Sequence, residues 1–154
     1  MEDILHNFSG ASPDGGDPNA VLIIGSHGEL YGTTGNAGSA FCTVHTFTSR
    51  KKGDGGFLPI GLAFGQAGIL YGATYDGGSG GRGNLYQLKP DPFGRTWIHT
   101  VLASFDGTNG AEVNGGLVID PNTVLWGTTH HGGADGNALQ DLRIALAPDC
   151  SVKP

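Results

Sequence analysis

The sequence predicts an all-β fold built from four-stranded antiparallel units that repeat along the chain. The first observation is a phrase that occurs three times: Leu-Tyr-Gly-Thr-Thr at residues 30–34, Leu-Tyr-Gly-Ala-Thr at 70–74 and Leu-Trp-Gly-Thr-Thr at 125–129. The second is a small apolar run before each copy, at residues 21–24, 61–64 and 116–119. Self-similarity of this kind is typical of stacked supersecondary units.

The third observation is the composition. Glycine supplies 29 of the 154 residues, and hydrophobic residues make up 38%. Because glycine reaches positive φ without steric cost, this balance favours short strands joined by tight turns. Disorder is the competing interpretation, and the ordered apolar runs with their aromatic partners argue against it.

The unit is clearest from residue 97 to residue 129. Residues 97–105 alternate and carry β-branched and aromatic side chains, which is typical of a strand. A turn, a strand, a second turn and another strand follow, at residues 106–110, 117–119, 120–123 and 124–129. A glycine-rich loop at 130–137 closes the unit, and its earlier copy at 75–84 leads to a fourth strand at 85–88.

Four-stranded units with spacings of about 40 and 55 residues are typical of β-propeller blades. The units cover residues 1–40, 41–95 and 96–137, and the leading strand recurs at residues 4–8 and 43–47. The shorter interval, between the first and second copies, predicts two strands fused into one over residues 41–48. The non-repetitive tail, residues 138–154, is either a helix or a segment that covers a sheet edge. Two to three blades are too few to close a ring, so we expect chains to associate and complete it; the alternative is an open stack with exposed sheet edges.

The combined pattern resembles the GloVer-type tandem repeats of bacterial, mostly extracellular proteins. It joins the Leu-Tyr-Gly-Thr-Thr phrase and its glycine-rich loop to a preceding Thr-Val-Leu-x-Ser-Phe-x-Gly segment and a Gly-Leu-Val-x-Asp strand. The resemblance covers residues 4–137 and implies propeller blades, but it assigns no catalytic residue. The shortened second unit and the tail after residue 137 depart from the family pattern.

Charge and cysteine content exclude some classes of function. The formal net charge of −6 argues against nucleic acid or an anionic membrane as a partner. No stretch approaches the about 18 apolar residues of a membrane span, and the acidic start at Met1-Glu2-Asp3 does not resemble a signal peptide. Cys42 and Cys150 could form a disulfide or remain as thiols, so the cysteine content favours neither an oxidising nor a reducing compartment.

Acidic turns are the candidate metal ligands. Calcium prefers six to eight oxygen ligands, which Asp, Asn and Glu on bent loops supply together with backbone carbonyls. The candidates are Asp14, Asp17, Asp106, Asn109 and Glu112. The alternative is that these side chains start turns by bonding their own backbone.

Histidines are the candidate bases. His130 and His131 follow the third copy of the phrase directly and precede a loop that contains Asp135. These three residues are the predicted catalytic set, because histidine is the usual general base near neutral pH. Adjacent residues of a strand point to opposite faces, so we expect at most one of the two histidines to face a pocket.

Two classes of function follow from these residues. The first is a calcium-dependent hydrolase of small-molecule lactones or short esters, by analogy with propellers similar to gluconolactonases and paraoxonases. No signature of a covalent nucleophile competes with it. The second is a non-catalytic module that binds glycans or proteins, or a scaffold without a ligand of its own.

Overall fold

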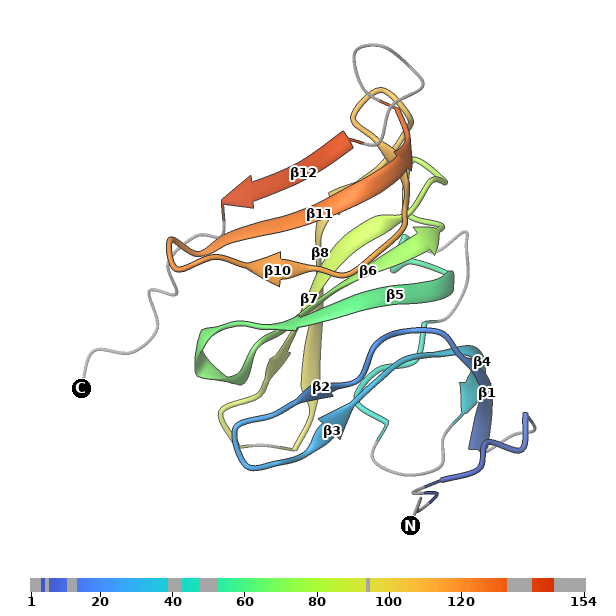
Figure 1. Ribbon diagram of the computed structural model, residues 1–154, viewed down its shortest axis with the longest axis vertical. Helices are drawn as coiled ribbons and strands as arrows, with labels where there is room; N and C mark the ends of the chain where they lie inside the picture. Colours follow the sequence, from blue (N-terminus) through green and yellow to red (C-terminus); the bar gives the residue numbers. More distant parts are fainter. Residues whose placement is uncertain are drawn as a thin grey trace.

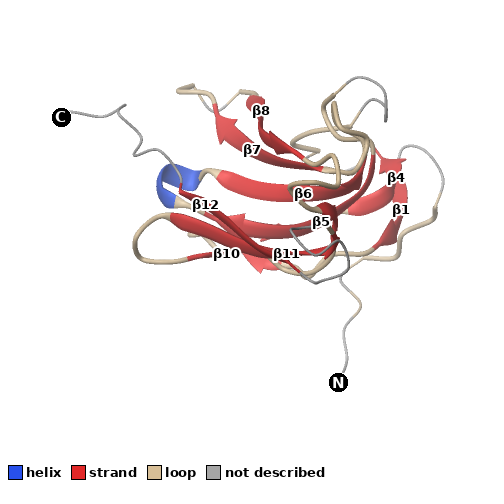
Figure 2. Cartoon of the chain, turned by 90° about the horizontal axis from the view of Figure 1, so that it is seen from above, coloured by secondary structure: helices blue, strands red, loops and turns tan. Residues whose placement is uncertain are grey.

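Three layers of antiparallel strands follow one another through the molecule in the order of the sequence (Figure 1). The computed structural model describes residues 4, 6–10, 14–38, 43–47, 53–93, 95–132 and 140–145. Within these residues, helix is confined to one short turn, η1 (Gln66–Gly68), and strands make up nearly all the regular structure (Figure 2). The all-β prediction is therefore confirmed.

The second layer is a complete four-stranded antiparallel sheet. Its strands are β5 (Phe57–Phe64), β6 (Leu70–Asp76), β7 (Asn84–Pro90) and β8 (Trp97–Ser104), hydrogen-bonded in that order. Each strand pairs with the strand before it in the sequence, as short turns favour. Gly72 allows the close packing of this sheet, because a Cβ there would overlap the ring of the buried Tyr86.

The first and third layers are built from shorter pieces. In the first, β1 (Asp14–Pro18) pairs with β4 (Thr34–Gly38), and β2 (Ile23–Ile24) pairs with β3 (Leu30–Tyr31). In the third, β9 (Ala111–Val113), β10 (Val118–Ile119) and β12 (Gln140–Ala145) all pair with β11 (Val124–His131). The layers formed by the described residues do not close into a ring.

The strand register repeats from layer to layer. The leucine that begins each phrase lies opposite an apolar residue, in the pairs Ile24–Leu30, Phe64–Leu70 and Ile119–Leu125. The last threonine of each phrase also has an equivalent partner, in the pairs Pro18–Thr34, Pro59–Thr74 and Val113–Thr129. The repeated phrase therefore marks a repeated piece of structure.

Two predictions about secondary structure are wrong. The leading strand forms only in its third copy, as β8, because the described residues of the copies at 4–8 and 43–47 lie outside any strand. The fused strand predicted over 41–48 is therefore absent at 43–47. Of the two alternatives for the tail, the helix is absent at 140–145, and the segment instead covers the edge of β11 as β12, as β7 covers β6.

Two hydrophobic clusters fill the spaces between the layers. The cluster between the second and third layers consists of Ala63, Ile69, Tyr71, Ala73, Leu85, Phe105, Val113, Leu117 and Leu125. Between the first and second layers lie Leu70, Tyr86 and Leu88, packed by Ile23, Tyr31, Val44, Phe47, Phe64 and Trp97. Among the residues that the structure describes, the second layer is thus covered on both faces, whereas each outer layer packs against a neighbouring layer on one.

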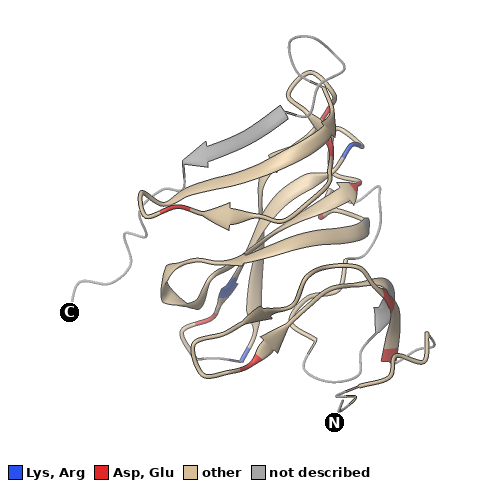
Figure 3. Cartoon of the chain, viewed as in Figure 1, with Lys and Arg blue, Asp and Glu red and all other residues tan. Residues whose placement is uncertain are grey.

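Charged side chains are sparse on the sheets and gather at turns and strand ends (Figure 3). Among the described residues, no helix has the length and apolar character needed to cross a lipid bilayer.

Candidate functional site

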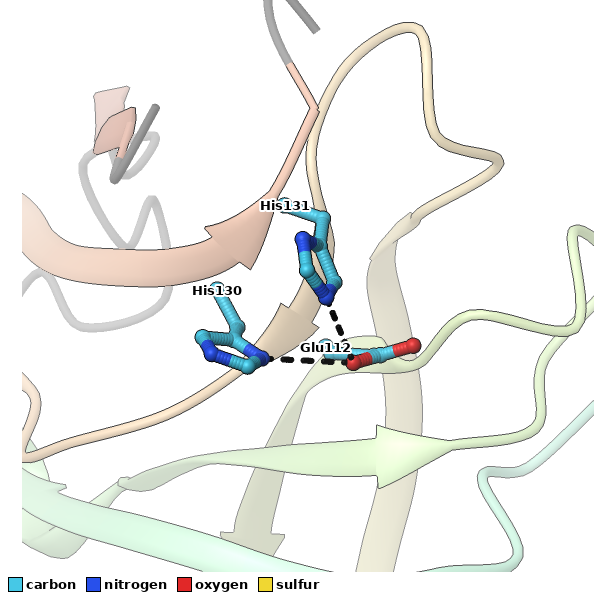
Figure 4. Close-up of side chains that lie close together, drawn as sticks. All are labelled: Glu112, His130 and His131. Atoms are coloured by element: carbon cyan, nitrogen blue, oxygen red, sulfur yellow. Dashed lines mark ion pairs between the residues drawn. The ribbon is translucent and has the colours of Figure 1, made fainter. Parts of the chain in front are cut away.

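Three metal-ligating side chains converge at one end of the third layer: Glu112 from β9, and His130 and His131 from the end of β11 (Figure 4). Oε2 of Glu112 lies 3.5 Å from Nδ1 of His130 and 3.6 Å from Nε2 of His131. One ligating atom of each residue lies within 4.8 Å of the other two. The Glu112 side chain is 22% exposed, and the imidazoles are 49% and 51% exposed. The carboxylate is therefore sheltered while the histidines are open to solvent.

An unusual backbone conformation aims Glu112 at this site. Its φ is +57°, in the left-handed region that non-glycine residues seldom adopt. Asp17 and Leu58 hold equivalent places in the first two layers, with φ of +54° and +49°. A left-handed residue departs from the pleat of its strand, so its side chain can point toward the preceding layer. Leu58 does so, since its Cδ2 lies 3.2 Å from the Cβ position of Gly35.

The second layer contributes Tyr75 and Arg82. The Tyr75 hydroxyl donates to Oε2 of Glu112 at 2.6 Å. The Glu112 N–H donates to the Arg82 carbonyl at 2.9 Å, and Nη1 of Arg82 lies 4.0 Å from Oε1 of Glu112. Sequence reasoning missed both residues. The position of Tyr75 in the repeat could have identified it as a site residue, since it directly follows the second copy of the phrase as His130 directly follows the third.

The surroundings of Glu112 stabilise its charged form. The hydrogen bond from Tyr75 lowers the pKa of Glu112, burial opposes this, and His130 and His131 lower the pKa further. The same hydrogen bond raises the pKa of Tyr75, because the neutral phenol is the donor. At neutral pH the site therefore holds an ionised carboxylate and a neutral phenol.

Two of the three separations between the candidate ligand atoms are close to those of ligands around one small metal ion. Two ligands about 2.1 Å from a tetrahedral metal lie about 3.4 Å apart. The two measured separations from Oε2 of Glu112, 3.5 and 3.6 Å, are close to this value. Two imidazoles and one carboxylate are a zinc-type donor set, and a three-ligand centre leaves a position for water or substrate.

Both histidines approach Glu112, although adjacent residues of a regular strand point to opposite faces. Their ring centroids lie 4.2 Å apart. His131 is the last residue of β11 and is followed by Gly132 at φ +107°, where the regular alternation ends. The left-handed φ of Glu112 adds to this effect, because its Oε2 comes within 3.5 Å of His130 Nδ1 and 3.6 Å of His131 Nε2.

Two of the five predicted calcium ligands, Asp106 and Asn109, serve their own turn. Oδ1 of Asp106 accepts hydrogen bonds from the N–H and the hydroxyl of Thr108, at 2.8 and 2.7 Å, and these bonds lower the pKa of Asp106. Oδ1 of Asn109 accepts the N–H of Asp106 at 3.0 Å. Nδ2 of Asn109 donates to the Ser104 carbonyl at 3.1 Å. This turn leads into β9 and thereby helps to position Glu112.

The remaining candidates lie apart from the site. Asp14 bonds His6, with 2.8 Å between Oδ1 and Nε2, and accepts the Ser9 N–H. Asp17 is exposed on β1. In the part of the chain that the structure describes, no group of three metal-ligating side chains includes Asp14, Asp17 or Asp106. Asp135 lies outside the described residues.

A second pair of histidines lies between residues 43–47 and β8. The rings of His45 and His99 stack, with centroids 4.4 Å apart and planes inclined by 6°. Burial lowers the pKa of both imidazoles, while the charge of Asp54 acts in the opposite direction. This pair packs as neutral rings against Phe47 and Tyr86.

An open pocket of about 440 Å³ lies at the other end of the layers, beside the β2–β3 and β5–β6 turns. Its lining consists of Ile24, Gly25, Ser26, Phe64, Gly65, Ala67 and Gly68. Since none of these side chains titrates near neutral pH, the pocket offers no acid, base or strong metal ligand.

Comparison of the chain with protein-family models, with curated proteins and with solved structures finds no match.

Proposed function

We propose that the chain is a metal-dependent hydrolase whose centre is formed by Glu112, His130 and His131. The observation that carries the proposal is the convergence of these three donors, with their ligating atoms within 4.8 Å of one another. The substrate class is lactones or short esters, which need no covalent nucleophile when a metal activates water. The donor set favours zinc over the calcium expected from the acidic turns, because calcium prefers an all-oxygen shell.

Each residue has a defined task in this proposal. When bound, the metal polarises the substrate carbonyl and lowers the pKa of bound water. The two imidazoles and the carboxylate hold the metal, so the histidines act as ligands rather than as the free bases first expected. Tyr75 fixes the orientation of the Glu112 carboxylate, as hydrogen-bonded neighbours of ligands commonly do. Arg82 brings a positive charge to the rim, where an acyl oxygen becomes negative.

We also propose that the three layers are blades of a GloVer-type β-propeller. The equivalent registers of the three layers and their order along the chain support this assignment. In propellers the ends of the inner strands surround a common axis, where sites are shared between blades. The hydrogen bond between Tyr75 and Glu112, which come from different layers, supports a site shared between blades.

Metal binding tests the first half of the proposal. Zinc and calcium are titrated separately into metal-free protein by calorimetry, and bound metal is counted by mass spectrometry. We expect one zinc ion per chain, with affinity at least tenfold lower in Glu112→Gln. His27→Gln is the matched control, since His27 is 84% exposed on a turn and should leave zinc affinity unchanged. Equal zinc affinity in all three proteins, or tight binding of calcium alone, would contradict the assignment.

Turnover tests the second half. Hydrolysis of p-nitrophenyl acetate and of simple lactones is followed with metal-free protein, after zinc is added back, and in Glu112→Gln. We expect activity that returns with zinc and is lost in the variant. A protein that binds zinc at this site and hydrolyses none of these substrates would refute the hydrolase and favour a non-catalytic binding module.

A further inference from the structure

One contact between layers occurs twice within the chain. Tyr31 of the first layer meets Phe64 of the second, with ring centroids 5.0 Å apart in an edge-to-face arrangement. A Cβ on Gly25 would lie 3.0 Å from Cε2 of Tyr31 and 3.5 Å from Cζ of Phe64. The glycine therefore leaves room for an aromatic ring to cross the backbone.

The second and third layers repeat this arrangement. Tyr71 is equivalent to Tyr31, and Ile119 is equivalent to Phe64, by strand register. A Cβ on Gly65 would lie 2.5 Å from Cε2 of Tyr71 and 3.5 Å from Cδ1 of Ile119. In each case an aromatic residue of one layer therefore packs against an apolar residue of the following layer: Tyr31 against Phe64, and Tyr71 against Ile119.

The outer layers carry the two complementary halves of a third such contact. On the third layer, Trp126 is equivalent to Tyr71, and Val118 lies opposite it. On the first layer, Ile24 is equivalent to Ile119, and Leu30 lies opposite it. These four side chains are exposed: Trp126 at 38%, Val118 at 63%, Ile24 at 69% and Leu30 at 49%. Their counterparts Tyr71 and Leu70, inside the chain, are 6% and 1% exposed.

The tryptophan is also held in place. Asp120 occupies the position of Gly25 and Gly65, and its Oδ2 accepts the indole N–H of Trp126 at 3.0 Å. Oδ1 of the same carboxylate accepts the N–H groups of Asn122 and Val124 at 2.8 and 2.9 Å. A side chain that is already ordered loses less entropy when a partner covers it, so this arrangement favours binding.

We propose that the outer face of the third layer binds the outer face of the first layer in a second copy of this chain. Trp126 and Val118 of one copy then contact Ile24 and Leu30 of the other, in the geometry already used twice inside each chain. Each copy presents both faces, so the same contact can form twice between two copies, and the proposed assembly is a closed six-layer dimer. Closure leaves no outer face exposed, whereas an unclosed arrangement would extend into filaments. The inference does not depend on the metal site, which lies within one chain.

Two substitutions test the interface by light scattering coupled to gel filtration. Ile24→Glu and Trp126→Glu each place a charge on one of the two faces, and either should convert the dimer to a monomer. Ile98→Glu is the matched control, because Ile98 is 52% exposed on β8, away from both faces, and should leave the dimer intact. Circular dichroism spectra and melting curves establish that each variant is folded.

Fluorescence gives a second measurement on the unmodified interface. Trp97→Phe leaves Trp126 as the sole tryptophan of the chain. We expect its emission to shift to shorter wavelength as the concentration rises through the monomer–dimer transition. A monomer at every concentration would overturn the proposal. Loss of the dimer in only one of the variants Ile24→Glu and Trp126→Glu would also overturn it. That result would mean that the same face of both copies forms the contact, first layer to first layer or third layer to third layer.

Discussion

The hydrogen bond between Tyr75 and Glu112 is the contact whose removal tests the site most directly. Tyr75→Phe deletes the hydroxyl that donates to Oε2 at 2.6 Å and keeps the ring in place. A hydrogen bond to a charged group contributes roughly 1.5–3 kcal/mol when it is well sheltered. Glu112 is 22% exposed, so water replaces part of the lost bond. We therefore expect a loss of about 1 kcal/mol in the free energy of unfolding at pH 7.

The pH dependence identifies the charged partner. The folded-state pKa of Glu112 is lowered, so its charge contributes stability above the unfolded-state pKa, and this contribution is lost as pH falls through the folded-state value. Since the hydrogen bond from Tyr75 is the largest cause of that shift, the difference between wild type and Tyr75→Phe should shrink in acid. Urea unfolding at a series of pH values, followed by circular dichroism, measures this difference.

A double-mutant cycle assigns the effect to the pair. Tyr75→Phe, Glu112→Gln and the double variant together give a coupling free energy, which we expect to be about 1 kcal/mol at pH 7. A coupling free energy within error of zero would refute the reasoning. A stability difference that is the same at pH 3 and pH 7 would refute it as well, because the bond depends on an ionised carboxylate.

Two further predictions concern stability. Burial lowers the pKa of His45 and His99 in the folded chain, so the unfolded chain binds more protons as pH falls below about 6.5 and stability declines there. Replacing both histidines with phenylalanine should flatten this part of the stability curve, and an unchanged slope would exclude the pair as its cause. Gly72→Ala should destabilise the fold by about 2 kcal/mol, since its Cβ would overlap the buried Tyr86 ring. Gly116→Ala, whose Cβ would meet nothing within 4 Å, should change the melting temperature little, and equal effects of the two substitutions would contradict the packing argument.

Local patterns predicted part of the site as well as the strands. The acidic residue Glu112 was a predicted metal ligand, and His130 and His131 were predicted to be functional. The contact between them could not be inferred from sequence. Glu112 has a left-handed φ, which directs its side chain away from the regular direction of a strand, and the histidines lie at the end of β11, where the alternation of side chains between the two faces stops. Asp106 and Asn109 looked like ligands on the same grounds but bond their own turn.

By itself, the sequence determined the strand type, the repeat and the turns, since each depends on neighbours within a few residues of the chain. Residues 4–8 and 43–47 show the limit, because their described residues form no strand in spite of a strand-like pattern. Residues 140–145 show it too, because pairing with β11 makes them a strand in spite of helix-forming residues. Only the tertiary structure decided that Tyr75 reaches Glu112, 37 positions further along the chain. That contact depends on how two layers stack, and stacking is governed by the packing of many side chains at once.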